Sequence, residues 1–353
     1  MEPFLRHSGA GQIFIKYCST FDSTPKGNIG PVVDAVMEEL DVKYTILCPA
    51  LPVNGRTVKD GRLYVNGVPL DESPMRNHPL TPMWDSSIAS LMRPQGKYDC
   101  LVMNREMMRR TDSGIQAVLE DFGRDRSHFY VIPDYINDSD ADRIVALFGD
   151  LPLLTGGSGL MERLARRHGS TMPLHGEVSC ATKGPALVLA GSCSVATLAQ
   201  IRHFTENGAC GIRLDPDRLK DPEAIAKIRE QVRENRGRKI ILYSSVPGEE
   251  LRRAGKSKKQ IAEDAAVIEQ SIADIAENAV EDGYTRIIVA GGETSGAVTK
   301  RLGFSAYDIS DSVAPGVPVM IPVSNRKIRL VLKSGNFGQE DFFDRALSMT
   351  TGA

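Results

Sequence analysis

The sequence predicts an α/β protein of two domains, each with a mostly parallel sheet flanked by helices. Two observations lead to this prediction. The chain has 353 residues, which is more than a single hydrophobic core usually serves. In both halves, short apolar runs alternate with helical patterns, as is typical of parallel α/β architecture. We expect a first domain at residues 1–168, an aperiodic linker rich in Gly, Pro, Ser and Thr at 169–184, and a second domain at 185–353.

The first half supplies the elements of the first domain. The segment 55–70 interrupts them, because two β-rich runs joined at Asp60 and Gly61 are typical of a hairpin. We expect this hairpin to lie outside the main sheet. The expected strands are residues 12–17, 44–50, 128–133 and 151–159, and the expected helices are residues 30–40, 113–122 and 140–149.

The second half repeats the alternation. Its charge-dense segment 248–260 interleaves acidic residues with Lys and Arg, so we interpret it as a solvated connection rather than a basic binding patch. The expected strands are residues 186–192, 209–214, 239–245, 286–292, 317–322 and 328–335, and the expected helices are residues 195–207, 222–232 and 261–281.

Composition excludes several classes of partner. With 43 basic and 45 acidic side chains the net charge is −2, so no surplus of positive charge calls for nucleic acid or an anionic membrane. No apolar run approaches the ~20 residues of a membrane helix. The six cysteines form no Cys-x-x-Cys pair and have no His at ligand spacing, which argues against zinc and disulfides and favours a reducing cytoplasm. A homo-oligomer is compatible with these observations.

Three loops of the second domain follow expected strands and carry glycines with small hydroxyl residues. Ligands of parallel sheets bind beyond the carboxyl ends of the strands, and glycines at a helix start leave backbone N–H groups open to phosphate. The alternative is that these glycines only permit turns. Neither a Walker P-loop nor a Gly-x-Gly-x-x-Gly fingerprint is present, so a nucleotide site here must be of another design. The loops are residues 190–194, 290–296 and 333–338.

The first domain has one dense polar loop, residues 16–30, between an expected strand and an expected helix. Its hydroxyls, amide and cations can donate to a polyhydroxy carboxylate, while a carboxylate can accept from a hydroxyl. Helix capping is the alternative, but the polar groups outnumber what one cap uses. The candidate substrate-binding residues of this loop are Lys16, Ser19, Asp22, Ser23, Thr24 and Asn28.

Seven short motifs follow one another between residue 13 and about residue 346. They are KYCSTFDSTPKGNIGP, CPALPVNGRTVKDGRLYVNGVPL, MRNHPLTPM, LTGGSGL, AGSCSVATLAQI, VAGGETSGAV and LKSGNFG. In this order they resemble the four-carbon acid sugar kinases, specifically the 3-oxo-tetronate kinase branch. The resemblance implies ATP-dependent phosphorylation of the C4 hydroxyl of a 3-dehydrotetronate. It also implies a sugar acid held mainly by the first domain, ATP held by the second, and an active site in the cleft between them.

The same resemblance implies where ATP is contacted and which ion accompanies it. Mg²⁺ is expected because phosphoryl transfer depends on a cation between the β- and γ-phosphates, although no cluster of protein ligands for it can be recognised. By position, the implied ATP contacts are Ser192, Gly291, Gly292, Glu293, Thr294 and Gly335.

Two further residues are candidates for the substrate site. Arg56 can pair bidentately with a carboxylate or form an ordinary salt bridge. His78, between Asn and Pro in MRNHPLTPM, can contact a substrate carboxylate or simply occupy a surface turn, and the resemblance favours contact.

The catalytic base is left unassigned. Family members carry an acidic motif of the Ala-Asp-Asp-x-Thr-Gly-Ala type before the loop at 16–30, and the 353 residues contain no such motif, so Asp22 is the remaining candidate. We therefore expect either a kinase whose start is mis-assigned or a catalytically impaired, nucleotide-binding remnant of one. A threonate or erythronate kinase is an alternative that the Cys-Ser-Thr-Phe-Asp-Ser-Thr wording disfavours. An NAD-dependent oxidoreductase fits the alternation but lacks the fingerprint.

Overall fold

The computed structural model describes residues 9–78, 81–169, 178–191, 194–244 and 257–352. The chain divides into two compact units, Met1–Leu174 and His175–Ala353. Ser192, Cys193 and most of the charge-dense segment at 248–260 lie outside the described residues. Within the described part, no helix is both long enough and apolar enough to cross a membrane.

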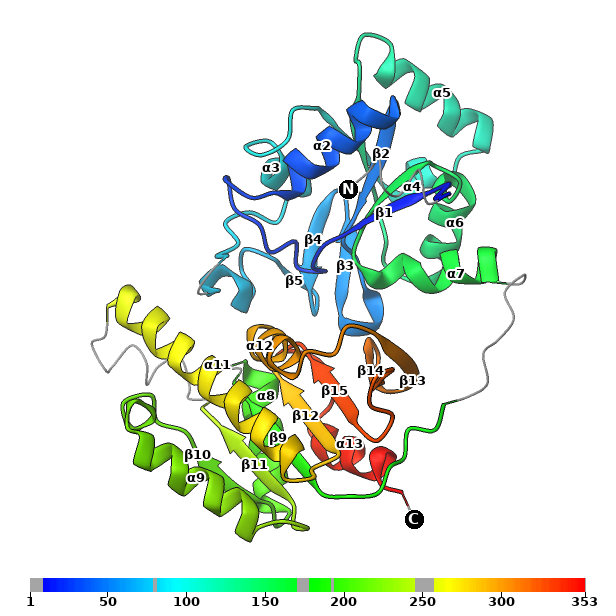
Figure 1. Ribbon diagram of the computed structural model, residues 1–353. Coiled ribbons are helices and arrows are strands. Elements are labelled where there is room, and N and C mark those ends of the chain that lie inside the picture. The colour runs from blue at the N-terminus through cyan, green and yellow to red at the C-terminus, as the bar shows by residue number, and fades with distance from the viewer. Residues whose placement is uncertain (1–8, 79–80, 170–177, 192–193, 245–256, 353) are drawn as a thin grey trace. The chain divides into compact units, whose positions relative to one another are not determined.

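The first unit contains a sheet of five parallel strands in the order β1-β8-β2-β7-β6. Figure 1 labels β1 and β2 of this sheet. Apolar runs form these strands, and the central strand β7 is buried at every position, whereas the edge strands β1 and β6 are mostly half-buried. The sequence predicted four of the strands and missed β6. The bounds are β1 Ile13–Lys16, β2 Tyr44–Cys48, β6 Cys100–Met103, β7 Phe129–Pro133 and β8 Leu153–Gly156.

Helices of the first unit connect these strands. The helix expected at residues 30–40 begins one residue earlier, at Ile29, so Pro31 lies in the first turn, where a missing N–H costs little. The short helices α3, α4 and α7 were not predicted. The bounds are α2 Ile29–Leu40, α3 Ile88–Met92, α4 Arg105–Met108, α5 Asp112–Gly123, α6 Asp138–Phe148 and α7 Met161–Gly169.

The predicted hairpin is confirmed as part of a separate antiparallel sheet of three strands, β3 Arg56–Lys59, β4 Arg62–Val65 and β5 Val68–Pro69. Asp60 and Gly61 have φ of 50° and 70°, the left-handed pair that a tight two-residue hairpin needs. Asn66 and Gly67 make the second turn in the same way, with φ of 52° and 80°.

The second unit contains a seven-stranded sheet in the order β10-β11-β9-β12-β15-β14-β13. The first five strands are parallel, whereas β14 and β13 run antiparallel. Strand β13 was not predicted, because its sequence YDISDSVA is too polar to give an apolar run. The bounds are β9 Ala186–Ala190, β10 Cys210–Arg213, β11 Ile240–Tyr243, β12 Arg286–Ala290, β13 Tyr307–Ala314, β14 Val317–Pro322 and β15 Arg329–Lys333.

Helices cover both faces of this sheet. Successive residues of a strand point to opposite faces, so Leu187 and Leu189 pack toward α11 while Val188 packs with Phe204 of α8 and Phe342 of α13. A helix start was expected within the glycine loop at 290–296, and α12 begins there, at Gly292. Helix α13 was not predicted, and α11 begins at Lys258 rather than near Ile261. The bounds are α8 Val195–Glu206, α9 Pro222–Glu234, α11 Lys258–Glu281, α12 Gly292–Leu302 and α13 Phe342–Thr350.

Strand β13 forms one edge of this sheet and is irregular. Its pairing with β14 shifts register between Ile309 and Ser312 and again between Ser312 and Ala314. Residues 178–180 run beside it, where the Cys180 thiol lies 3.1 Å from the Ser310 hydroxyl.

Candidate active site

In the first unit, three loops leave the carboxyl ends of the neighbouring strands β1, β8 and β2. Backbone hydrogen bonds join them, because the Tyr17 N–H donates to Gly156 O at 3.0 Å and the Gly157 N–H donates to Cys48 O at 3.0 Å. The dense polar loop at 16–30 is therefore held beside the LTGGSGL segment and the start of the loop after β2. Ligands of parallel sheets bind beyond the carboxyl ends of the strands, where these loops lie.

Glycines of LTGGSGL allow the loops after β8 and β2 to pack closely. A Cβ at Gly156 would lie 2.3 Å from Cys48 O, one at Gly157 2.5 Å from Pro49 O, and one at Gly159 2.1 Å from Ala50 O. These approaches exclude any side chain, so the three glycines serve the packing of two loops.

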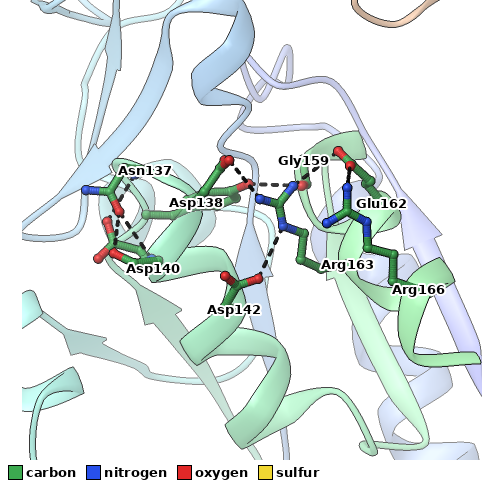
Figure 2. Close-up of polar contacts among 10 residues, drawn as sticks. Asn137, Asp138, Asp140, Asp142, Gly159, Glu162, Arg163 and Arg166 are labelled. Atoms are coloured by element: carbon green, nitrogen blue, oxygen red, sulfur yellow. Dashed lines mark hydrogen bonds and ion pairs between the residues drawn. The ribbon is translucent and has the colours of Figure 1, made fainter.

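Arg163 fixes the helix that follows this glycine loop. It lies in α7, and Figure 2 shows its guanidinium between carboxylates of α6 and α7. The Nη2 atom is 2.8 Å from Asp138, Nε is 3.3 Å from Asp142, and Nη1 is 3.1 Å from Glu162. The Tyr135 hydroxyl also donates to Gly159 O at 2.9 Å. Together these contacts anchor the loop where it leaves the sheet.

The polar loop after β1 contains two strained residues. Phe21 and Asp22 have φ of 64° and 43°, a left-handed conformation that costs side-chain-bearing residues about 1–3 kcal/mol each. Phe21 is buried, with its ring edge against Tyr17 at 5.5 Å between centroids. The buried Phe21 ring holds the chain in this left-handed turn, which also contains Asp22. Backbone strain of this kind concentrates at functional sites.

Asp22 and Arg56 are brought together from two loops. Asp22 Oδ1 is buried and accepts no hydrogen bond from the described residues. Arg56, at the start of β3, is also buried. Burial lowers the pKa of Arg56, and the charge of Asp22 opposes that shift, so the two groups interact electrostatically. These two predicted residues therefore bring a buried carboxylate oxygen and a buried guanidinium close enough for their charges to interact.

Ser23 and Thr24 build the loop itself. The Ser23 hydroxyl donates to Gln95 Oε1 at 3.0 Å, and that oxygen also accepts from the Gly30 N–H at 3.2 Å. Thr24 Oγ1 accepts from the Lys26 N–H at 3.2 Å. Both predicted hydroxyls therefore have structural partners.

The remaining candidates of the loop are more open. Ser19 is half-buried, while Lys16 and Asn28 are exposed. Asn28 is the residue before α2, yet its side chain makes no cap hydrogen bond. Capping of α2 therefore does not account for its amide.

His78 is held by a turn in its own segment. Its Nδ1 lies 3.2 Å from the Thr81 N–H and 3.0 Å from Thr81 Oγ1. The N–H donates to Nδ1, so the ring orientation is fixed within this segment.

In the second unit, the three glycine loops meet at the carboxyl ends of the adjacent strands β9, β12 and β15. Ala190, Ala290 and Lys333 are paired across these strands. The Gly191 N–H donates to Ala290 O at 3.0 Å, and the Gly291 N–H donates to Lys333 O at 2.9 Å. Loops that are distant in the sequence are thus joined by backbone hydrogen bonds.

Helix α12 begins in the middle of this junction. Gly291 precedes it with φ of 125°, a conformation that only glycine adopts readily, and no side chain caps the helix. The first N–H groups of a helix have no partner within it, and a Cβ added at Gly292 would meet nothing within 4 Å. Open space therefore lies beside uncapped N–H groups, an arrangement that suits an anion.

Glu293 and Thr294 differ in their surroundings. Thr294 is buried, and a Cβ at Gly191 would lie 2.1 Å from its Oγ1, so its side chain fills the space that Gly191 leaves. Glu293 is exposed near Glu269 of α11. Burial, and secondly the charge of Glu293, raise the pKa of Glu269.

The loop at 334–339 is fixed by one face of α8. The Gly335 carbonyl accepts from Ser194 Oγ at 2.6 Å and from Thr197 Oγ1 at 2.8 Å. Gln200 Nε2 reaches three further carbonyls, those of residues 337, 338 and 339, at 3.0, 3.1 and 2.9 Å. Ser194, Thr197 and Gln200 are spaced by three, so they share a helix face. None of the three was a predicted contact, although Ser194 ends the predicted loop at 190–194 and polar residues at this spacing in a covered helix are a signal.

Lys333 was also missed. It ends β15, is only 1% exposed, and places Nζ 2.9 Å from Gly335 O, 3.0 Å from Thr197 Oγ1 and 3.3 Å from Ser334 O. Burial lowers the pKa of Lys333 to about 7. The sequence feature that could have indicated this buried lysine is its position directly after the apolar run IRLVL.

No group of three or more His, Cys, Asp or Glu that could hold a metal ion occurs within the described ranges. The described cysteines 48, 100, 180 and 210 are not paired in disulfides. Burial raises the pKa of Cys48 to about 12, which makes it a packing residue rather than a nucleophile.

Two family descriptions match most of the chain. Residues 2–164 match "Sugar-binding N-terminal domain", and residues 187–343 match "Nucleotide-binding C-terminal domain". The strained loop with Asp22 and Arg56 lies in the first match. The junction of α12, Lys333 and α8 lies in the second.

Several known proteins that are similar to this chain are named 3-oxo-tetronate kinase. A 3-oxo-tetronate kinase of Cupriavidus necator is 38% identical over 355 residues, which cover 99% of this chain and 81% of that protein. A 3-oxo-tetronate kinase of Pseudomonas savastanoi pv. phaseolicola is 36% identical and covers 99% and 82%. The crystal structure of a Haemophilus influenzae protein superimposes on this chain with a TM-score of 0.71 and 37% sequence identity. The match covers 99% of this chain and 84% of the Haemophilus influenzae chain.

Proposed function

The chain belongs to the four-carbon acid sugar kinase family, and from this premise we propose that it transfers the γ-phosphoryl group of ATP to the C4 hydroxyl of a 3-oxo-tetronate. The product is the 3-oxo-tetronate 4-phosphate. Relatives named for this activity align with 99% of the chain, so the similarity extends over both units.

The observation that carries the nucleotide half of this proposal is the start of α12. Uncapped N–H groups, a glycine-only conformation at Gly291 and open space at Gly292 together suit a phosphate group. The N–H groups of Gly292, Glu293 and Thr294 would hold it, since the Thr294 side chain is buried. Gly335 contributes through the shape of its loop, because its carbonyl is directed toward α8 and Lys333.

Asp22 and Arg56 support the sugar-acid half. A guanidinium in a water-poor site pairs strongly with the carboxylate of a sugar acid. The buried Oδ1 of Asp22 accepts no bond from the described residues, so a substrate hydroxyl can donate to it. Ser19, Lys16 and Asn28 are accessible for further contacts, whereas Ser23 and Thr24 shape the loop.

Phosphoryl transfer needs positioning and charge neutralisation more than covalent chemistry from the protein. Mg²⁺ bound to ATP would neutralise charge on the β- and γ-phosphates. The described residues offer no metal cluster of their own, which is compatible with an ion that arrives on the nucleotide. In this proposal Arg56 and Asp22 orient the sugar acid, and the α12 N–H groups orient the phosphates.

The test is turnover of defined substrates by this chain. We would measure ADP release with 3-oxo-tetronates of both configurations, with threonate and erythronate as comparisons, and locate the new phosphate by ³¹P and ¹H NMR. The proposal expects phosphate on C4 of a 3-oxo-tetronate. Turnover of threonate or erythronate alone would establish the alternative kinase, and ATP binding without any turnover would establish a nucleotide-binding remnant.

A further inference from the structure

Lys333 is a buried lysine at the end of β15, the strand next to the one that leads into α12. It is not among the ATP contacts that the family resemblance implies. We propose that Lys333 is the counter-charge for the bound nucleotide, so that nucleotide binding draws one proton onto its amine. This inference rests on the proposed function, because it takes the α12 start as the phosphate site.

The position of Lys333 follows from the strand register. It pairs with Ala290 across β15 and β12, and its carbonyl accepts the Gly291 N–H at 2.9 Å. Neighbouring strands lie about 4.8 Å apart, so Lys333 is directly adjacent to the residue that opens α12. The Nζ atom also lies at the carboxyl end of β15, beside the loop at 334–339, and because Lys333 is buried little water screens its charge from a phosphate at the α12 start.

The groups around Nζ can accept hydrogen bonds from an ammonium group, but none of these acceptors carries a negative charge. Three acceptors, Gly335 O, Ser334 O and Thr197 Oγ1, match its three N–H donors. The Phe342 ring lies 5.7 Å away and adds a weak cation–π contact. All of these partners are uncharged, and a buried cation with only dipoles around it is costly.

Charged groups on the surrounding elements are engaged elsewhere. On α13, Asp344 pairs with Lys239 at 2.6 Å and lies 3.7 Å from His203 of α8. Glu340 and Asp341, in the loop before α13, are exposed. Arg286 is at the opposite end of β12, where it donates to Gly184 O. The lysine therefore lacks a carboxylate partner among the described residues that surround it.

The direction of proton movement follows. Burial has lowered the pKa of Lys333 to about 7, so at pH 8 the amine of the free protein is mostly neutral. A bound polyphosphate favours the ammonium form and raises that pKa, so the amine takes up a proton from solvent. In the neutral form the Thr197 hydroxyl can turn from Gly335 O and donate to the amine, which keeps the site satisfied.

Calorimetry tests this on the full chain. MgATP and MgADP are titrated at pH 8 in buffers of different ionisation enthalpy, and the dependence of the binding enthalpy on that quantity gives the protons taken up. If binding raises the pKa of Lys333 by one unit from about 7, we expect about 0.4 proton per nucleotide at pH 8, and a larger rise brings the uptake closer to one. If binding raises the pKa by one unit, affinity should weaken about fivefold from pH 7 to pH 9.

Two variants separate this role from structural support. Lys333→Arg stays charged throughout this range, so proton uptake should vanish and affinity should lose its pH dependence. Lys333→Met should also abolish uptake but bind more weakly at pH 7. Lys300→Met, on the exposed surface of α12, is the matched control and should retain uptake and affinity.

The outcomes are distinguishable. Nucleotide binding by the unmodified protein without proton uptake overturns the role of Lys333 and leaves the proposed function intact. Uptake that persists in a folded Lys333→Arg protein overturns it as well. No nucleotide binding at all overturns the proposed function, and this inference with it.

Discussion

The two candidate ligand sites differ in how much of their polar chemistry is already satisfied. In the first unit, the loop after β1 is strained at Phe21 and Asp22, and a buried carboxylate oxygen accepts no bond from described residues. In the second unit, the loop at 334–339 is tied to α8 by side chains that saturate its carbonyls. In the proposed function a substrate hydroxyl donates to the Asp22 oxygen, whereas the second site is already held together by the protein's own hydrogen bonds before an anion binds.

This difference predicts opposite trade-offs between stability and function. Removing a polar group such as the Asp22 carboxylate from the first site should cost activity but little stability, because its Oδ1 accepts no hydrogen bond from the described residues. Removing one from the second should cost stability first. The following experiments test that contrast, in order of expected effect.

Arg56→Met should have the largest effect. It leaves Asp22 buried without its cation and the sugar carboxylate without its partner, so kcat/KM for the sugar acid should fall by roughly two to three orders of magnitude. KM for ATP should change little. Steady-state kinetics check both constants, with Arg62→Met as control because that β4 side chain is 54% exposed and pairs only loosely with Asp85. A fall no larger than in the control would remove Arg56 from the site.

Asp22→Ala should lower kcat/KM for the sugar acid by about one to two orders of magnitude, the value of a hydrogen bond to a charged group. Because Oδ1 is unsatisfied in the free protein, the melting temperature should not fall by more than in Asp60→Ala, which removes a carboxylate from another left-handed residue. A loss confined to kcat would instead identify Asp22 as the general base. Unchanged kinetics in a folded protein would mean that the loop does not bind substrate.

Gly292→Val should weaken ATP binding by about 1–3 kcal/mol, roughly 5- to 150-fold, since a branched side chain would occupy the open space beside the α12 N–H groups. The backbone strain belongs to Gly291, so Gly292→Val should still fold. Gly296→Val, also open and one turn further along α12, controls for helix propensity. Calorimetry that finds equal affinities in the two variants would refute the phosphate assignment.

Gln200→Leu should have the smallest effect on function and a clear effect on stability. It removes the donor shared by three carbonyls of the 337–339 loop, so the free energy of unfolding should drop by about 1–3 kcal/mol while ATP affinity changes only a few-fold. Urea unfolding and calorimetry measure the two quantities. A larger loss of affinity than of stability would contradict the idea that this site is assembled by the protein itself.

Local patterns predicted most of the parallel framework. Apolar runs such as FYVIP and RIIVA become buried strands, and Asp60-Gly61 takes the conformation its turn type requires. Strand β13 was missed because Asp308, Ser310 and Asp311 obscure its alternation, and it exists because β14 pairs with it. Such an edge strand depends on a tertiary partner more than on its own sequence.

The sites were predicted less completely, for a similar reason. The glycine loops could be found because backbone freedom is visible in the sequence. The burial of Lys333, its contact with Thr197 and the left-handed turn at Phe21 depend on residues distant in the chain, so no local pattern indicates them. The role of each site residue stays a prediction until the variants above are measured.

The irregular edge at β13 has a consequence for how copies of this protein meet in concentrated solution. A straight, apolar edge strand offers its free N–H and C=O groups as a template on which another chain can pair, which is a common route to aggregation. Here the register shifts bend the strand, Asp311 and Ser312 are exposed along it, and residues 178–180 lie against Ser310. The edge is thereby a poor template, so a seven-stranded sheet can remain open on that side without recruiting an eighth strand from a neighbour.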